Sequence, residues 1–139
     1  MHDAGVWNGR VFVALEYVEG TTAARVLKAC AERGQRLPPV AVAYLVAEAA
    51  TGLDYAHRRE DEQRRPLQIV HRDVSPQNLF ITYEGQIKLI DFGIATLSDS
   101  VTRSDGHALK GKLAYMSPEQ ARGERVDRRT DVFAAGVML

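Results

Sequence analysis

The feature that most constrains the fold is a long stripe of apolar residues at helical spacing. The stripe follows the proline pair Pro38 and Pro39, and its members are Val42, Leu45, Val46, Ala49, Leu53 and Ala56. This spacing is typical of a helix that buries one face, and proline is well tolerated in the first turn of a helix. We therefore predict a core helix that begins at the proline pair and ends near Ala56.

Strand-like segments lie on both sides of this helix. The run RVFVALEYV, Arg10–Val18, is rich in β-branched and aromatic residues and follows an Asn-Gly turn. This pattern favours a hairpin whose second strand is largely buried, and we expect Gly20 to end that strand. After the helix, residues 79–82 and 87–90 are short apolar runs joined by a turn, so we predict a second hairpin.

Three further segments complete the predicted organisation. Thr21 or Thr22 can cap a short helix that ends near Ala31. Residues 91–120 are polar and too irregular for a strand, so we expect a long loop that is either functional or disordered. The last segment, DVFAAGVML from Asp131, has apolar residues on every side and predicts a fully buried helix. Strands and helices in this order indicate an α+β fold.

Net charge and cysteine content indicate which partners and which cellular compartment to expect. The chain has 139 residues, and its 18 basic and 18 acidic side chains give no net charge, so we expect neither nucleic acid nor a membrane surface as the partner. The one cysteine, Cys30, cannot form an internal disulfide and fits a reducing compartment. With no signal-peptide pattern and no apolar run long enough to span a bilayer, we expect a cytoplasmic location.

Three oxygen-bearing side chains follow predicted buried elements. Asp73 and Asn78 lie five residues apart in a proline-containing loop after an Ile-Val run, and Asp91 follows the second predicted hairpin. Carboxylate and amide oxygens are the ligands that Mg²⁺ prefers. The pattern therefore indicates a loop that could hold a metal ion.

Three short motifs occur in one order at compatible spacing: HRDVSPQN at residues 71–78, DFG at residues 91–93 and SPE at residues 117–119. On these motifs the chain resembles a protein kinase domain of the serine/threonine class, the bacterial relatives of the eukaryotic enzymes included. The resemblance implies a kinase-like α+β fold. Residues 1–20 would be the last hairpin of the N-lobe sheet and the hinge, and residues 21–139 the first half of the mainly helical C-lobe.

The resemblance implies ATP and Mg²⁺ as cofactors and a protein as the substrate. In this family the residue at Asp73 is the base that accepts the proton of the substrate hydroxyl, and the residues at Asn78 and Asp91 hold the metal ions. LEYV would be the segment that binds adenine. Its Leu15 side chain would guard the back of the pocket, and backbone groups of Glu16 and Val18 would pair with the adenine edge.

Leu79 and the residues around the motifs receive supporting roles from the same resemblance. Leu79 would pack beneath the adenine ring, although a plain core role predicts nearly the same environment. The remaining structural positions are His71, Phe92, Gly93, which lets the loop turn, Asp131, which ties its helix to the catalytic loop, and Glu119. The usual partner of Glu119 in this family is a later arginine, so we expect Glu119 to have no partner here.

Arg72 directly precedes the proposed base. In this family an arginine at that position marks kinases whose activation loop is ordered when a phosphate meets it. Thr102 and Ser104 are the candidate phosphate acceptors, with ordinary polar loop residues as the alternative interpretation.

Two departures from the family pattern concern charge near Asp73. Ser75 stands where these kinases usually have a lysine, and Lys112 stands where they usually have a threonine. We expect that a cation and a hydroxyl have exchanged positions, so that the Lys112 amine points to Asp73 or Ser75 and stabilises the transferring phosphate. A solvated loop lysine is the alternative.

The family also has a glycine-rich loop, a strand lysine and a glutamate that pairs with the lysine. No stretch before Arg10 in this sequence resembles any of these three features. We therefore expect a serine/threonine protein kinase fragment that is inactive as written. The alternative is a non-catalytic, pseudokinase-like binding module that associates with another kinase chain, or a non-functional gene fragment.

Overall fold

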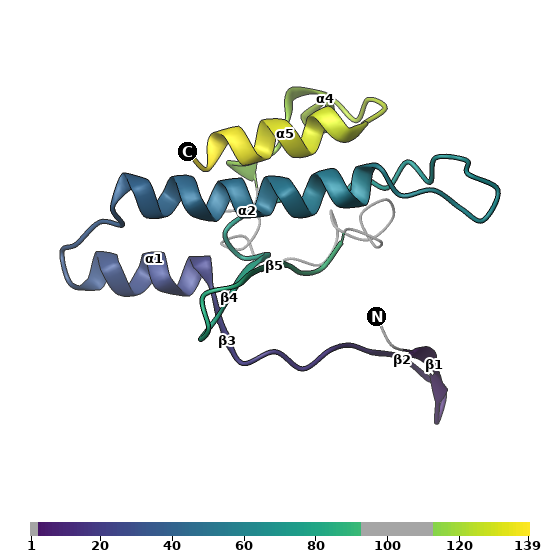
Figure 1. Ribbon diagram of the computed structural model, residues 1–139, viewed down its shortest axis with the longest axis horizontal. Helices are drawn as coiled ribbons and strands as arrows, with labels where there is room; N and C mark the ends of the chain where they lie inside the picture. The colour runs from purple at the N-terminus through teal and green to yellow at the C-terminus, as the bar shows by residue number, and fades with distance from the viewer. Residues whose placement is uncertain (1–2, 93–112) are drawn as a thin grey trace.

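The computed structural model describes residues 3–92 and 113–139. Their elements are β1 (Asp3–Trp7), β2 (Arg10–Ala14), β3 (Gly20–Thr22), α1 (Ala23–Glu32), α2 (Pro39–His57), β4 (Leu79–Thr82), β5 (Ile87–Leu89), α4 (Pro118–Ala121) and α5 (Arg128–Val137). The mixture of small sheets and helices confirms the predicted α+β class. Figure 1 shows the elements along the chain.

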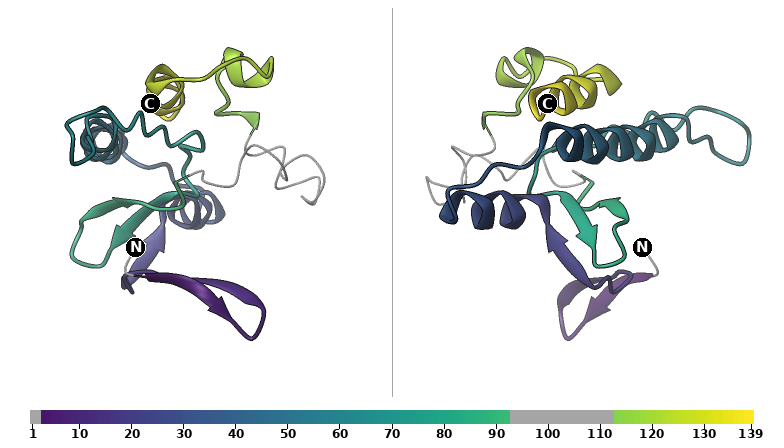
Figure 2. Two further views of the ribbon diagram at one scale, coloured as in Figure 1. Left: turned by 90° about the vertical axis from the view of Figure 1, so that its right-hand side faces the viewer. Right: turned by 60° about the vertical axis from the view of Figure 1, so that its left-hand side comes forward.

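The long helix α2 is the centre of the packing, as its apolar stripe predicts. Figures 1 and 2 show α5 on one side of α2, with α1 and the β4–β5 hairpin on the other. Ala49 joins a buried cluster with Ala23 and Leu79. Leu53, one turn later, joins a second cluster with Val74 and Ala134. The segment around residue 74 is therefore packed between α2 and α5.

The short helix α1 begins where its cap predicts. The Thr22 hydroxyl accepts a hydrogen bond from the Arg25 N–H, which satisfies one donor of the first turn. Pairing with the second hairpin positions the start of this helix. Strand β3 pairs antiparallel with β4, and β4 pairs with β5.

Gly20 begins β3, so the expectation that it ends the preceding strand was wrong. A Cβ atom at Gly20 would lie 2.2 Å from the carbonyl oxygen of Ile81 on β4. Only glycine allows the two backbones to approach this closely. The glycine therefore serves a strand contact that is distant in sequence.

The β1–β2 hairpin forms with the predicted turn, but its second strand is not buried. Val11 and Val13 are 79% and 51% exposed, and the strand ends at Ala14 instead of Val18. In the described part of the chain only β1 pairs with β2. Figure 1 shows this hairpin at the end of an extended segment, away from the helices. The run of β-branched and aromatic residues predicts a strand, but burial needs a partner layer.

Helix α5 also differs from its prediction. It begins at Arg128, with Asp127 as the N-cap, and its face is divided between buried and exposed residues. Ala134 and Ala135 are buried, whereas Val132 is 63% exposed. The helix is not buried on every side because α2 packs against one face of it. Within the described ranges no helix is both long and apolar enough to cross a membrane.

Candidate active site

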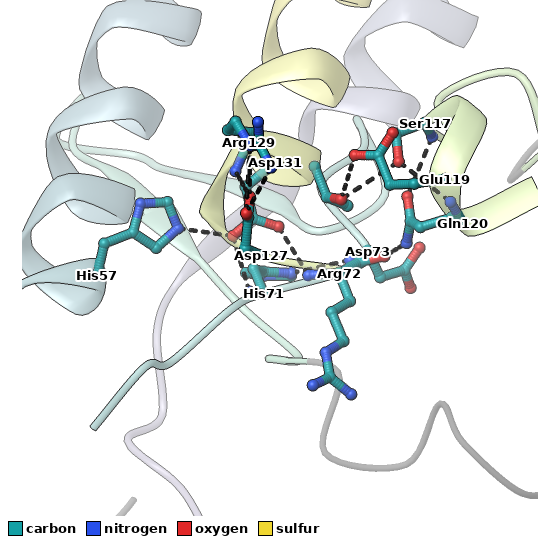
Figure 3. Close-up of polar contacts among 11 residues, drawn as sticks. His57, His71, Arg72, Asp73, Ser117, Glu119, Gln120, Asp127, Arg129 and Asp131 are labelled. Carbon is teal, nitrogen blue, oxygen red and sulfur yellow. Dashed lines mark hydrogen bonds and ion pairs between the residues drawn. The ribbon is translucent and has the colours of Figure 1, made fainter. Parts of the chain in front are cut away.

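The loop between α2 and β4 is held by one buried carboxylate on α5. Asp131 is fully buried, and its Oδ2 accepts hydrogen bonds from the His71 N–H at 2.8 Å and from His57 Nε2 at 2.7 Å. Its Oδ1 accepts from the Arg72 N–H at 2.8 Å. Figure 3 shows these contacts converging on Asp131. Because two backbone amides share one carboxylate, the loop has little freedom to move relative to α5.

His57 was not among the residues singled out from the sequence. It is the last residue of α2, and only 7% of its side chain is exposed. The available signal was a polar ring at the end of the apolar stripe, one position after Ala56. That position carries no indication of a partner 74 residues away on α5.

His71 fixes the next step of the loop through its ring. Its Nδ1 accepts a hydrogen bond from the Asp73 N–H at 3.3 Å, so the ring proton lies on Nε2 and is donated to the Ile90 carbonyl at 3.1 Å. The ring also packs on Phe92, with centroids 4.5 Å apart. His71 therefore connects the loop before Asp73 to the segment that leads from β5 to Asp91.

Asn78 holds the side chain and the backbone of Asp73. Its Nδ2 donates to the Asp73 carbonyl at 2.7 Å and to Asp73 Oδ2 at 2.9 Å. The backbone of Asn78 is itself fixed, since its N–H donates to the Ser75 carbonyl and its carbonyl accepts from the Ile90 N–H. The carboxylate of Asp73 is thus oriented by a buried amide instead of by a flexible surface group.

The same arrangement tests whether the site suits a divalent cation. The Nδ2 atom of Asn78 donates to Asp73, which leaves Oδ1 as the amide oxygen that could bind a cation. Asp91, two residues after the end of β5, is exposed and has a φ of 55°. No group of three or more His, Cys, Asp or Glu side chains in the described ranges could hold a metal by itself. The available oxygens nevertheless are the ligand type of Mg²⁺, so these residues fit that ion.

Arg72 adopts a strained backbone directly before Asp73. Its φ is 66°, a left-handed value that costs a non-glycine residue roughly 1–2 kcal/mol. Asp131 binds its N–H, and Gln120 Nε2 donates to its carbonyl at 2.8 Å. Figure 3 shows the Arg72 side chain pointing away from Asp131. Its Nε atom is buried without an acceptor in the described part of the chain.

A cleft of about 870 Å³ adjoins the Arg72 side of the loop. Its lining includes four arginines, which are Arg72, Arg125, Arg128 and Arg129. Glu124 and Asp127 also line it, and Arg129 is paired with Asp127 at 2.9 Å. The remaining positive charge makes this cleft suitable for an anionic group.

Ser75 is 1% exposed, and its hydroxyl has no hydrogen-bond partner among residues 3–92 and 113–139. A buried hydroxyl without a partner is costly, which singles out this position next to Asp73. Lys112, its expected counterpart, lies outside the described residues, as do Gly93, Thr102 and Ser104.

The residues expected to bind adenine are only partly drawn together. Leu15, Glu16 and Val18 lie in the extended segment between β2 and β3, where Leu15 is 63% exposed and Glu16 pairs with Lys88. Leu79 instead is buried in the cluster with Ala23 and Ala49. The geometry is compatible with both interpretations of Leu79.

Glu119 has a partner, contrary to the expectation from the sequence. The Thr130 hydroxyl on α5 donates to Glu119 Oε1 at 2.7 Å, and this bond, with further hydrogen bonds and the nearby charge of Arg129, lowers the pKa of Glu119. The Thr130 oxygen also lies 3.2 Å from the Ser117 hydroxyl. Since Thr130 donates to Glu119, Ser117 donates to Thr130. The Ser117 hydroxyl thus donates to Thr130 on α5, and the Thr130 hydroxyl donates to Glu119 on α4.

Comparison with known proteins places these residues in a wider context. The family model for the protein kinase domain matches residues 2–139. The chain is 40% identical over 139 residues to the tyrosine-protein kinase MasK of Myxococcus xanthus and 34% identical over 139 residues to the serine/threonine-protein kinase PrkC of Bacillus subtilis. It is 36% identical over 129 residues to the serine/threonine-protein kinase PknB of Mycobacterium leprae. These matches include 100%, 100% and 92% of this chain but only 22%, 20% and 19% of the respective relatives.

Proposed function

This chain belongs to the protein kinase domain family, and from that premise we propose that it is the catalytic-loop region of a serine/threonine protein kinase. Such an enzyme transfers the terminal phosphoryl group of ATP to a protein hydroxyl. The observation that carries the proposal is that Asn78 donates hydrogen bonds to both the carbonyl and the carboxylate of Asp73. A carboxylate whose orientation is fixed in this way is suited to receive a proton from a hydroxyl.

The proposed mechanism assigns a separate task to each residue. Asp73 positions the substrate hydroxyl and takes its proton as the hydroxyl oxygen bonds to the terminal phosphorus of ATP, while the bond from that phosphorus to the bridging oxygen breaks and ADP leaves. Asn78 keeps Asp73 Oδ2 in place, and Asn78 Oδ1 and Asp91 would hold Mg²⁺. When bound, that ion neutralises charge on the phosphate oxygens. Asp131 and His71 restrain the backbone on either side of Arg72, so that the geometry does not have to be rebuilt in each turnover.

A pair of variants tests the role of Asp73. Asp73→Asn keeps the size of the side chain but removes the base, so phosphoryl transfer by the whole protein should fall by about two orders of magnitude or more. Asp54→Asn is the matched control, because Asp54 lies on the exposed face of α2 and pairs only with Arg58 in the described structure. Equal activity of the two variants would contradict the proposal.

The identity of the acceptor residue needs its own experiment, because the names of the relatives differ on this point. One is called a tyrosine-protein kinase, and two are called serine/threonine-protein kinases. We propose serine or threonine on the basis of the sequence resemblance. Analysis of the phosphorylated amino acids produced from a mixed peptide library would decide, and phosphotyrosine as the main product would overturn this assignment.

We further propose that Ser75 and Lys112 act together at Asp73. The buried hydroxyl of Ser75, unpartnered in the described ranges, supports a polar group at this place, and Lys112 would supply the cation that the family usually has at the Ser75 position. Ser75→Lys and Lys112→Thr should each impair turnover, and the double variant should recover much of the loss. Additive losses would indicate a solvated lysine instead.

We also propose regulation by phosphorylation of Thr102 or Ser104. The Nε of Arg72, which has no acceptor among the described residues, and the arginine-lined cleft beside it are suited to a phosphate, which would add roughly −1.5 to −2 charge. The Thr102→Ala, Ser104→Ala double variant should lose activation without losing fold. Full activity of that variant would refute the assignment.

A non-catalytic role in binding another kinase chain is the second candidate. The observation in its favour is exposed apolar surface on β1, β2 and α5, including Trp7 at 72% and Val132 at 63%. A protein in which Asp73→Asn leaves the cellular role intact would support this alternative.

A further inference from the structure

Gln120 is the side chain of α4 that hydrogen-bonds to the loop before Asp73. Its Nε2 donates to the Arg72 carbonyl at 2.8 Å, and its Oε1 accepts from the Ser117 N–H at 3.1 Å. The second bond completes a capping box at the start of α4. Gln120 therefore uses both ends of its amide, one for its own helix and one for the loop.

The bond to Arg72 completes a closed ring of contacts. Asp131 binds the Arg72 N–H, and its neighbour on α5, Thr130, is hydrogen-bonded to Ser117. Ser117 in turn is joined to Gln120, which returns to the Arg72 carbonyl. Helix α5 thus reaches both sides of the same residue, directly at its nitrogen and through α4 at its oxygen. Figure 3 shows the two contacts on opposite sides of Arg72.

The strained residue lies inside this ring. A left-handed φ of 66° at Arg72 persists only if its surroundings favour it over relaxed conformations. The orientation of the Arg72 carbonyl is coupled to the direction in which the chain enters Asp73. A donor at that carbonyl consequently selects the backbone geometry that places the Asp73 carboxylate.

We propose that Gln120 is a positioning residue for Asp73, acting through the Arg72 carbonyl. It holds the strained peptide from the side opposite Asp131 and couples the placement of α4 to the orientation of the base. The catalytic part of this inference rests on the proposed kinase function, whereas the coupling of α4 to the loop does not.

The two bonds of Gln120 can be separated by one substitution. Gln120→Glu keeps an oxygen that accepts from the Ser117 N–H, and a carboxylate near a helix N-terminus is favourable. The glutamate side chain lacks the N–H that binds the Arg72 carbonyl. One of its carboxylate oxygens would instead face the carbonyl oxygen and be repelled by it. Gln120→Met removes both bonds at similar volume. Gln86→Glu makes the same chemical change in the exposed turn before β5 and serves as the matched control.

Two measurements on a full-length protein that contains this chain test the proposal. In amide hydrogen exchange, the peptide covering residues 69–78 should exchange about 5–10-fold faster in Gln120→Glu than in the wild type or Gln86→Glu, as expected for loss of one partly buried hydrogen bond. In steady-state kinetics, kcat of Gln120→Glu should fall by about 10-fold or more while KM for ATP stays within about twofold.

The outcomes separate the two levels of the inference. Wild-type exchange and kcat in Gln120→Glu, with losses confined to Gln120→Met, would show that Gln120 only caps α4 and would overturn the proposal. Faster exchange with unchanged kcat would also overturn the positioning role. If the wild type of a full-length protein that contains this chain transfers no phosphate, the kinase function fails, and the exchange result still decides whether Gln120 couples α4 to the loop.

Discussion

Replacing Asp131 should destabilise the protein more than any other change to a single acidic side chain described above. The carboxylate is 0% exposed and accepts three hydrogen bonds, from the His71 N–H, the Arg72 N–H and His57 Nε2. Asp131→Ala would leave two backbone donors and one ring nitrogen buried without this acceptor. The Thr130 contacts on the same helix turn would depend on a less firmly held α5.

The magnitude follows from those donors. Each buried group left unsatisfied costs about 1–3 kcal/mol, and removal of one partner from a buried pair costs about 3–5 kcal/mol in total. Relaxation of Arg72 from its left-handed φ would return roughly 1–2 kcal/mol of this cost. We therefore expect Asp131→Ala to lower the free energy of unfolding by about 3 kcal/mol. Asp131→Asn, which retains one acceptor oxygen, should lower it by about 2 kcal/mol.

Urea unfolding followed by circular dichroism would measure this loss. At a slope of about 1–3 kcal/mol per molar urea, a loss of 3 kcal/mol shifts the midpoint by about 1–3 M. Asp127→Asn is the control on the same helix, because Asp127 is exposed, its side chain bonds within the described structure only to Arg129, and asparagine is an equally good N-cap. If the midpoint of Asp131→Ala matches that of Asp127→Asn, the argument from buried donors is refuted.

Three other predictions concern the pH dependence, the activity and the association of the chain. The pKa of Glu119 is lowered mainly by the Thr130 hydroxyl, so stability from this bond is present above the ordinary value of 4.5 and is lost as the pH falls below it. Thr130→Val should reduce that acid-sensitive part in urea titrations at several pH values, and an unchanged pH profile would contradict it. Prepared alone, these 139 residues should transfer no labelled phosphate above background, because they contain no glycine-rich loop or strand lysine; transfer abolished by Asp73→Asn would disprove this. The same preparation should associate through its exposed strand β2 and the open face of α5, and a monomer in analytical ultracentrifugation would count against it.

Local sequence was sufficient wherever neighbours along the chain determine the structure. The apolar stripe after Pro39 predicts α2 because burial follows the helical period. The adjacent Thr21 and Thr22 predict the start of α1 to within one residue, because the hydroxyl of a cap serves its own first turn, and Thr22 is the cap. The hairpin containing β4 and β5 follows for the same reason. The motifs around Asp73, Asp91 and Glu119 were sufficient to indicate the family.

Tertiary structure decided which groups meet and which faces are covered. His57 and Asp131 are 74 residues apart in sequence, and nothing near either residue indicates their contact. Glu119 gained a partner from α5, and β2 remained exposed, because hydrogen bonding and burial depend on what lies opposite in space. The sequence by itself therefore determined the local elements and the chemical groups of the site, since these depend on residue type and short spacing. The strained backbone of Arg72 and its hydrogen bonds to Asp131 and Gln120 could be seen only in the folded structure. Three segments that are distant in sequence must come together at this one residue.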